Sequence, residues 1–161
     1  HLTRAIEIHP TYRNAYLLLG NTHYYAKRYH EAIATYDKCL EVSPGYREVL
    51  NNFPIILREG GKEMGKIQDF NTAELWLNRA YQMNQQDFET LRLLGITYGI
   101  KGQHQKAIEF FEKAIGVNPG EAVVYASMGT AYLNLGDREK SNFYFQKAKE
   151  LDPNALNHLS N

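Results

Sequence analysis

The sequence is poor in the residues that build covalent or metallic frameworks. Its single cysteine, Cys39, cannot form a disulfide within the chain, and its six histidines are not grouped in a ligand motif. No apolar run approaches the roughly 18 residues that a membrane-spanning helix needs. Lys plus Arg and Asp plus Glu number 18 each, so the formal net charge is zero. A general nucleic-acid binder is therefore not expected, because affinity for phosphate comes from clustered basic residues.

Catalytic signatures are missing as well. The sequence has no His-Glu-x-x-His metalloprotease motif, no Gly-x-x-x-x-Gly-Lys-Ser/Thr phosphate loop and no Gly-x-Ser-x-Gly nucleophile motif. We therefore expect a non-catalytic protein without a cofactor or a metal site. The lone cysteine and the absence of an Asn-x-Ser/Thr sequon favour a reducing compartment such as the cytoplasm.

What the sequence does contain is a repeat with a period of 34 residues. The landmarks that recur at this spacing are Pro10 and Pro44, Pro119 and Pro153, Gly95 and Gly129, and Phe111 and Phe145. Gly20 and Gly95 lie 75 residues apart, as do Pro44 and Pro119, which is two periods and seven extra residues. The sequence therefore predicts four units, with an insertion of seven residues in the second.

These units make up a single array over residues 1–161. The predicted repeats are 13–46, 47–87 with the insertion, 88–121 and 122–155. Residues 1–12 resemble the tail of a preceding unit, and residues 156–161 the start of a following unit or a cap.

Each unit has the apolar period of two helices. In the third unit, Leu91, Leu94 and Tyr98 share one helical face, and Ala107, Phe111 and Ala114 share another after a break. Glycine in the middle of a helix costs about 1 kcal/mol relative to alanine. We expect Gly20, Gly95 and Gly129 to admit the second helix closely, with small residues opposite them: Ala32, Ala73, Ala107 and Ser141. One hairpin has too few large side chains to fold alone, so the hairpins must stack.

This pattern resembles the tetratricopeptide repeat (TPR) family. The matching residues of the third unit are Leu91, Leu94, Gly95, Tyr98, Ala107, Phe111, Ala114 and Pro119. Those of the fourth are Tyr125, Met128, Gly129, Tyr132, Ser141, Phe145, Ala148 and Pro153. The resemblance implies an all-α, right-handed superhelical solenoid of four helix-turn-helix repeats flanked by partial units.

The second unit departs from the family pattern. It has Pro54 where glycine is expected and Gln85 where proline is expected, although Ala73, Leu77 and Ala80 follow the pattern. The seven extra residues fall within 60–67, where three glycines favour a loop over two added helical turns. Such a loop is either a tolerated surface insertion or a part of the binding face, and the sequence leaves the choice between loop and helix extension open.

The resemblance also implies where a partner binds. Family members usually hold peptides in the concave groove lined by the first helices, at positions 2, 5, 6, 9, 12 and 13 of each repeat. The candidate binding residues at these positions are Asn14, Leu17, Asn21 and Tyr24; Asn51, Asn52, Ile55 and Arg58; Glu89, Arg92 and Ile96; and Ala126 and Thr130. Tyr25, Glu48, Val123 and Asn134 occupy further such positions. We expect the asparagines to bond a peptide backbone, and Arg58 and Arg92 to hold a carboxylate.

The expected function is that of a protein–protein interaction scaffold that binds a peptide segment or a partner helix. Two alternatives stay open. The array is a self-assembling structural element that associates through open repeat ends, or it is the targeting arm of a larger enzyme.

Overall fold

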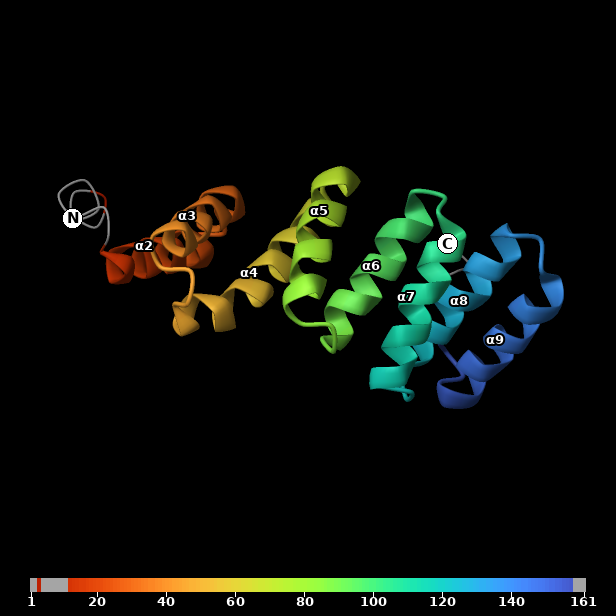
Figure 1. Ribbon diagram of the computed structural model, residues 1–161. Coiled ribbons are helices and arrows are strands. Elements are labelled where there is room, and N and C mark those ends of the chain that lie inside the picture. The colour runs from red at the N-terminus through yellow and green to blue at the C-terminus, as the bar shows by residue number, and fades with distance from the viewer. Residues whose placement is uncertain (1–2, 4–11, 158–161) are drawn as a thin grey trace.

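The computed structural model describes residue 3 and residues 12–157. Most of the expected tail of a preceding unit in residues 1–12, and residues 158–161, lie outside the described residues. Residues 12–157 form eight helices and no strand, labelled α2 to α9 in Figure 1. The expectation of an all-α chain is confirmed. None of the described helices is both long enough and apolar enough to cross a bilayer.

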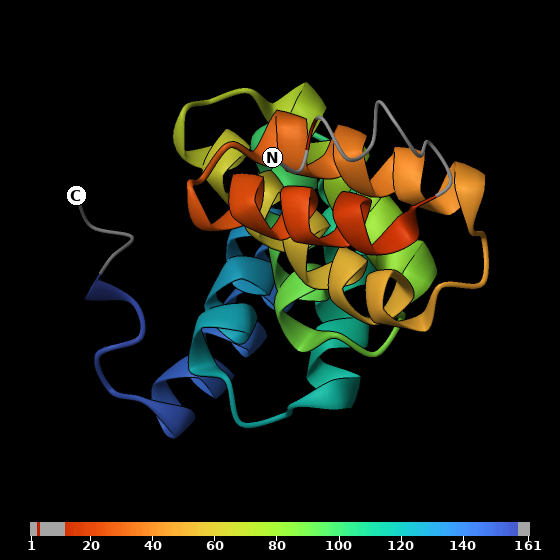
Figure 2. The same ribbon diagram turned by 90° about the vertical axis from the view of Figure 1, so that its left-hand side faces the viewer.

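The helices alternate between first and second members of hairpins. The first helices are α2 (Arg13–Tyr25), α4 (Arg47–Lys66), α6 (Phe88–Ile100) and α8 (Ala122–Asn134). The second helices are α3 (Tyr29–Val42), α5 (Phe70–Met83), α7 (His104–Val117) and α9 (Arg138–Leu151). The four hairpins follow one another along the array in Figure 1. Figure 2, seen from the N-terminal end, shows that successive hairpins are rotated relative to one another.

The helix contacts show which side of the array is the inner one. Each second helix packs against its own first helix, and α3, α5 and α7 also pack against the first helix of the next hairpin. Consecutive first helices also approach one another, whereas the backbones of consecutive second helices among the described residues lie further apart. The first helices α2, α4, α6 and α8 therefore line the inner, concave side of the solenoid.

A close approach between a glycine and a bulky side chain sixteen residues later recurs in all four hairpins. A Cβ atom added at Gly129 would lie 2.5 Å from the ring of Phe145, and one at Gly61 would lie 2.7 Å from Leu77 Cγ. Gly20 meets Tyr36 and Gly95 meets Phe111 in the same way. The expectation that small residues lie opposite these glycines is wrong: Ala107, for example, lies opposite Gly99, at 3.8 Å from an added Cβ. The missing side chain makes room for a ring or a leucine, which then fills the hairpin.

Three of these large side chains belong to one apolar core that extends from Tyr16 in α2 to Ala131 in α8. Tyr36, Leu77 and Phe111 are at most 2% exposed and belong to the same buried cluster. The ring of Tyr36 also stacks on Phe53 of α4, with centroids 5.3 Å apart. Tyr36 of α3 therefore contributes to its own hairpin and to the junction with the next one, as expected of hairpins that cannot fold alone.

The second hairpin corrects the predicted loop. Helix α4 runs unbroken through Pro54 and through Gly60, Gly61 and Gly65, so the extra residues form two helical turns. Gly60 and Gly61 are buried against Trp76 and Leu77 of α5. Packing against the partner helix outweighs the low helix propensity of glycine, which a sequence window cannot reveal.

The extra turns let α4 serve two registers. If Gly61 is placed at the repeat position of Gly95, the hairpin of α4 and α5 follows the 34-residue pattern with Pro54 as its first residue. The residues with left-handed backbone that follow the two first helices then match as well: Gln68 has φ 65° and Gly102 has φ 75°. The preceding hairpin packs on the earlier turns of α4, through the buried Val49 and Phe53, and reaches as far as Gly60, where an added Cβ would lie 3.3 Å from Tyr29 Cβ. Seven residues at 1.5 Å each displace the first hairpin by about 10 Å along α4.

The glycine contact predicts the effect of filling its space. The substitution Gly95→Leu should lower the free energy of unfolding by about 3 kcal/mol or more, because the Phe111 ring occupies the place of the new side chain. The matched control is Gly116→Leu in α7, where an added Cβ meets nothing within 4 Å. Urea unfolding of both variants checks this, and equal stabilities would contradict the packing described here.

The continuous α4 predicts that Pro54 destabilises its helix. The substitution Pro54→Ala should raise the free energy of unfolding by about 1–3 kcal/mol, since it restores an N–H that can bond the Leu50 carbonyl. Pro119 lies in an exposed turn, so Pro119→Ala should not stabilise the chain. Thermal unfolding followed by circular dichroism measures both variants. An unchanged or lower stability of Pro54→Ala would mean that the helix begins at Pro54.

Candidate functional site

The inner side of the array contains an apolar hollow between α6 and α8. Its volume is about 410 Å³, and its floor is formed by α7. The lining residues are Gly95, Ile96, Gly99, Ile100, His104, Phe111, Ser127, Thr130, Ala131 and Asn134. No Asp, Glu, Lys or Arg is among them, so this hollow suits an uncharged, apolar group.

A second hollow of about 290 Å³ lies between α4 and α6, with α5 beneath it. The lining residues are Gly61, Lys62, Gly65, Lys66, Phe70, Leu77, Leu93, Ile96, Thr97 and Ile100. Ile96 and Ile100 line both hollows, so the two form one groove across three first helices. We call these the α6–α8 hollow and the α4–α6 hollow.

The candidate residues of α2 are engaged within the fold. The Tyr46 hydroxyl donates a hydrogen bond of 2.7 Å to Asn14 Oδ1, and the Tyr36 hydroxyl one of 2.5 Å to Asn21 Oδ1. Burial raises the pKa of Tyr36 to about 12, so its hydroxyl stays protonated and donates at neutral pH. Leu17 and Tyr24 pack against the core. The Asn14–Tyr46 bond joins α2 to the start of α4, and the Asn21–Tyr36 bond joins α2 to α3; none of these four side chains lines either hollow.

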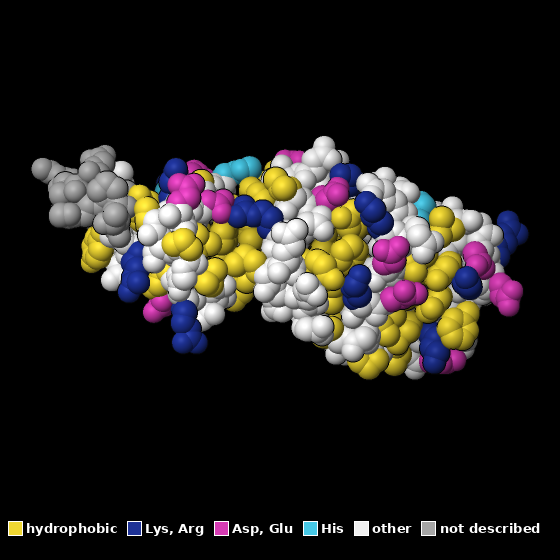
Figure 3. All heavy atoms as spheres, in the orientation of Figure 1, with side chains coloured by type: hydrophobic (Ala, Val, Ile, Leu, Met, Phe, Trp, Pro, Cys, Tyr) yellow, Lys and Arg dark blue, Asp and Glu magenta, His cyan; other side chains and the backbone are white. Residues whose placement is uncertain are grey.

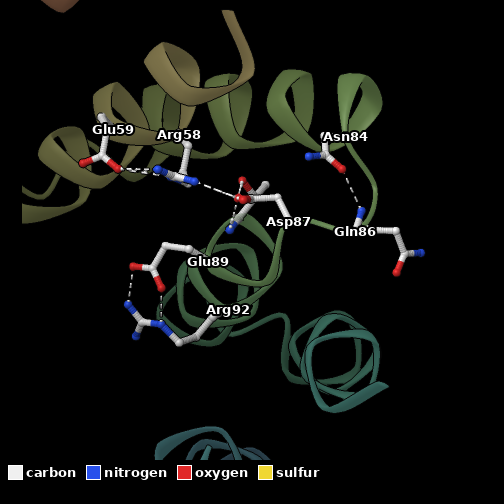
Figure 4. A network of polar contacts seen from close by, with 8 residues as sticks. Arg58, Glu59, Asn84, Gln86, Asp87, Glu89 and Arg92 are labelled. Atoms are coloured by element: carbon white, nitrogen blue, oxygen red, sulfur yellow. Dashed lines mark hydrogen bonds and ion pairs between the residues drawn. The ribbon is translucent and has the colours of Figure 1, made fainter. Parts of the chain in front are cut away.

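The candidate residues of α4 divide into two groups. Asn51, Asn52 and Ile55 are exposed, and none of them lines either hollow. Arg58 is half-buried and lies between two carboxylates (Figure 4). Its guanidinium donates to Asp87 at 3.0 Å and to Glu59 at 3.1 Å.

Asp87 is also the N-cap of α6, because it accepts hydrogen bonds from the Thr90 backbone N–H at 2.9 Å and from the Thr90 hydroxyl at 2.6 Å. Burial alone would raise its pKa, but the hydrogen bonds from Thr90 and Arg58 outweigh burial and lower it. The Arg58–Asp87 pair thus ties α4 to the start of α6.

The two candidate charged residues of α6 hold each other. Arg92 donates two hydrogen bonds to the Glu89 carboxylate, at 2.8 and 2.7 Å (Figure 4). These bonds lower the pKa of Glu89 and raise that of Arg92. Arg58 and Arg92 were expected to hold a partner's carboxylate, and in the described residues both already hold a carboxylate of this chain.

The remaining candidates differ in their access to the groove. Ile96 lines both hollows, and Thr130 and Asn134 line the α6–α8 hollow. Ala126 is 4% exposed and packs in a buried alanine cluster with Ala148, so it offers a partner little surface. The structure therefore brings Ile96, Thr130 and Asn134 together and leaves the others outside the groove.

Several groove residues were missed at the level of sequence, among them Gly61, Lys62, Gly65, Lys66, Leu93, Gly99, Ile100 and His104. Those of α4 were missed because positions were counted from Arg47. Gly61 and Leu77 have the same spacing as Gly95 and Phe111, so Gly61 takes the repeat position of Gly95 and Pro54 becomes position 1 of the repeat. Lys62, Gly65 and Lys66 then fall on positions 9, 12 and 13, which are inner-face positions.

Charge does not single out another surface. On the face shown in Figure 3, basic and acidic side chains are interspersed among apolar patches. Among residue 3 and residues 12–157, no three His, Cys, Asp or Glu side chains are grouped to hold a metal ion.

A row of helical hairpins whose first helices line a concave side defines an α-solenoid, and the comparisons with known proteins identify its family. Tetratricopeptide repeat family models match residues 14–46, 89–121 and 122–155, which together are more than half of the chain. The chain belongs to the tetratricopeptide repeat family. The hairpin of α4 and α5 lies between the matched stretches, in keeping with its long first helix.

Individual proteins resemble the chain at low identity. The mouse BBSome complex member BBS4 is 32% identical over 123 residues, which are 76% of this chain and 22% of BBS4. A crystal structure of MamA has a TM-score of 0.68 at 26% identity and covers 97% of this chain and 87% of its own. YrrB, a TPR protein with an unusual peptide-binding site, has a TM-score of 0.64 at 22% identity over 99% and 98% of the two chains. The chain spans only 17% to 27% of the length of its first curated relatives.

The Arg58–Asp87 contact predicts a pH-dependent contribution to stability. The pKa of Asp87 lies below its ordinary value of 3.8 in the folded state, so its carboxylate stabilises the fold above that pH and less as the pH falls below it. Asp87→Asn should therefore cost on the order of 1–2 kcal/mol at neutral pH, and this difference from the unmodified chain should shrink at acid pH.

Urea unfolding at neutral and acid pH measures this difference. Asp137→Asn is the matched control, since Asp137 caps α9 at 3.0 Å but pairs only with exposed Lys140 at 3.4 Å. Asp137→Asn should lower the free energy of unfolding by less than Asp87→Asn does at neutral pH, because asparagine also caps helices well. Equal costs for the two variants would show that Arg58 contributes nothing.

Proposed function

We propose that this chain is a non-catalytic protein-interaction scaffold that holds a peptide segment of a partner in the groove across α4, α6 and α8. The observation that carries the proposal is the continuity of two apolar hollows on the inner side, joined by Ile96 and Ile100. Membership of a family of interaction repeats supports it, as does the fold shared with YrrB, whose description names a peptide-binding site.

The size of the hollows fits side chains rather than a folded surface. Each hollow holds a few hundred Å³ and presents mainly apolar atoms. Burying one aliphatic side chain contributes about 1.5–3 kcal/mol. Two such side chains offset only part of the cost of association, so the groove should bind a segment with modest affinity that further contacts raise.

The groove predicts one residue whose change blocks binding without unfolding the chain. Ile100 is 58% exposed and lines both hollows, so Ile100→Arg places a charge between them while removing little from the core. A peptide selected from a random phage-displayed library against the unmodified chain should bind this variant at least about tenfold more weakly, because each tenfold is 1.4 kcal/mol. Fluorescence anisotropy with the labelled synthetic peptide measures the affinities.

The control is the same change on the outer side. Leu75 of α5 is 59% exposed and lines neither hollow. Leu75→Arg should bind as the unmodified chain does, and circular dichroism should give both variants a folded spectrum. A selection that enriches no peptide, or enriched peptides that bind Ile100→Arg as well as Leu75→Arg, would refute the groove as the binding site.

A further inference from the structure

One cation in the groove has no partner within the described residues. Lys62 is half-buried and lines the α4–α6 hollow, and its ammonium group makes no hydrogen bond or ion pair with any described residue. Lysine carries three donors on a positive charge, so an ammonium group beside an apolar surface is a ready site for an anion.

The carboxylates in the last turns of α4 and at the start of α6 are all held by other cations. Glu59 and Asp87 share Arg58, Glu63 accepts from Lys66 at 2.6 Å, and Glu89 is held by both arms of Arg92. Arg92 is the main cause of the lowered pKa of Glu89, and Lys62 adds a smaller effect from a distance. Because each of these carboxylates accepts from another cation, Lys62 is the one charged group among them whose donors are left without a hydrogen-bonded partner in the described residues.

The other end of the groove has no such charge. Helix α8 contains no Asp, Glu, Lys or Arg, and His104 is the only titratable group among the residues that line the α6–α8 hollow. The groove is therefore asymmetric, with an ammonium group at the α4 end and an uncharged apolar surface at the α8 end. A partner segment that matches it has one orientation.

We infer, on the basis of the proposed function, that the partner is an acidic peptide segment: two apolar side chains fill the hollows, and an Asp or Glu side chain beside the first of them pairs with Lys62. Neighbouring packed helices lie about 8–10 Å apart. An extended chain advances about 3.3 Å per residue. The two apolar side chains should therefore be about three residues apart.

The test is a selection from a phage-displayed library of random peptides that are fused through their C-termini, so that no terminal carboxylate is free. The unmodified chain should enrich peptides with an acidic residue next to one of two apolar residues. The enriched consensus peptide is then made with Glu or with Gln at the acidic position. We expect the Glu form to bind the unmodified chain about fivefold more tightly, with the preference lost in 1 M salt, where charges are screened within about 3 Å.

Variants of Lys62 separate its charge from its packing. Lys62→Glu should abolish or reverse the preference for Glu over Gln, and Lys62→Arg should keep it. Lys38→Glu is the matched control, because Lys38 lies on α3 with a side chain that is 64% exposed and pairs with Glu41. This control should leave the preference unchanged.

The outcomes distinguish the two proposals. Peptides that need Ile100 but show no acidic preference, or whose preference survives Lys62→Glu, would overturn the role of Lys62 and leave the groove in place. Failure to enrich any peptide would overturn both. Enrichment of basic residues by the unmodified chain would contradict the polarity of the groove.

Discussion

The fold depends on one steric relation, the absence of a side chain in the first helix of each hairpin opposite a bulky side chain in the second. Gly20, Gly61, Gly95 and Gly129 each leave the space that a ring or a leucine fills sixteen residues later. A glycine within a helix is unfavourable by itself, so the cost is recovered only when the hairpin closes. The same bulky side chain then meets the next first helix, as Tyr36 meets Phe53. Closure of one hairpin and docking of the next are therefore coupled, which makes the array cooperative.

Much of this could be predicted from the sequence, because it follows from local spacing. The 34-residue period and the two helical stripes in each unit are properties of positions such as Leu91, Leu94 and Phe111, and the structure has helices there. The partner of each glycine could not be predicted in the same way, because helix pairing decides whether Ala107 or Phe111 lies opposite Gly95. The prediction of a loop within residues 60–67 was wrong for a similar reason: Gly60 and Gly61 make room for side chains of α5 and do not interrupt the helix.

The candidate site residues also differ in whether their environment follows from local sequence or from contacts with distant parts of the chain. Position within the repeat was enough to place Ile96, Thr130 and Asn134 on the groove. It could not reveal that Asn14 and Asn21 receive hydrogen bonds from Tyr46 and Tyr36, because those donors lie 32 and 15 residues further along the chain. A polar side chain on an inner helix face is available to a partner only when the fold leaves its hydrogen bonds unmade. Lys62 meets this condition among the described residues, and Arg92 does not.

The offset within α4 connects the fold to the groove. The core contacts of the first hairpin fall on the earlier turns of α4, at Val49 and Phe53, and the Gly61–Leu77 contact with α5 falls later, so the two parts of the array are displaced by about two helical turns. Seven residues are close to two full turns, so the inner face of α4 keeps nearly the same direction in both registers. The displacement therefore preserves the solenoid, and the residues of α4 that line the hollow, such as Lys62 and Lys66, lie in its last turns, in the register that α5 follows. The two hollows accordingly take from α4 only residues of its last turns and none from α2, so the extra length of this one helix supplies a wall of the groove.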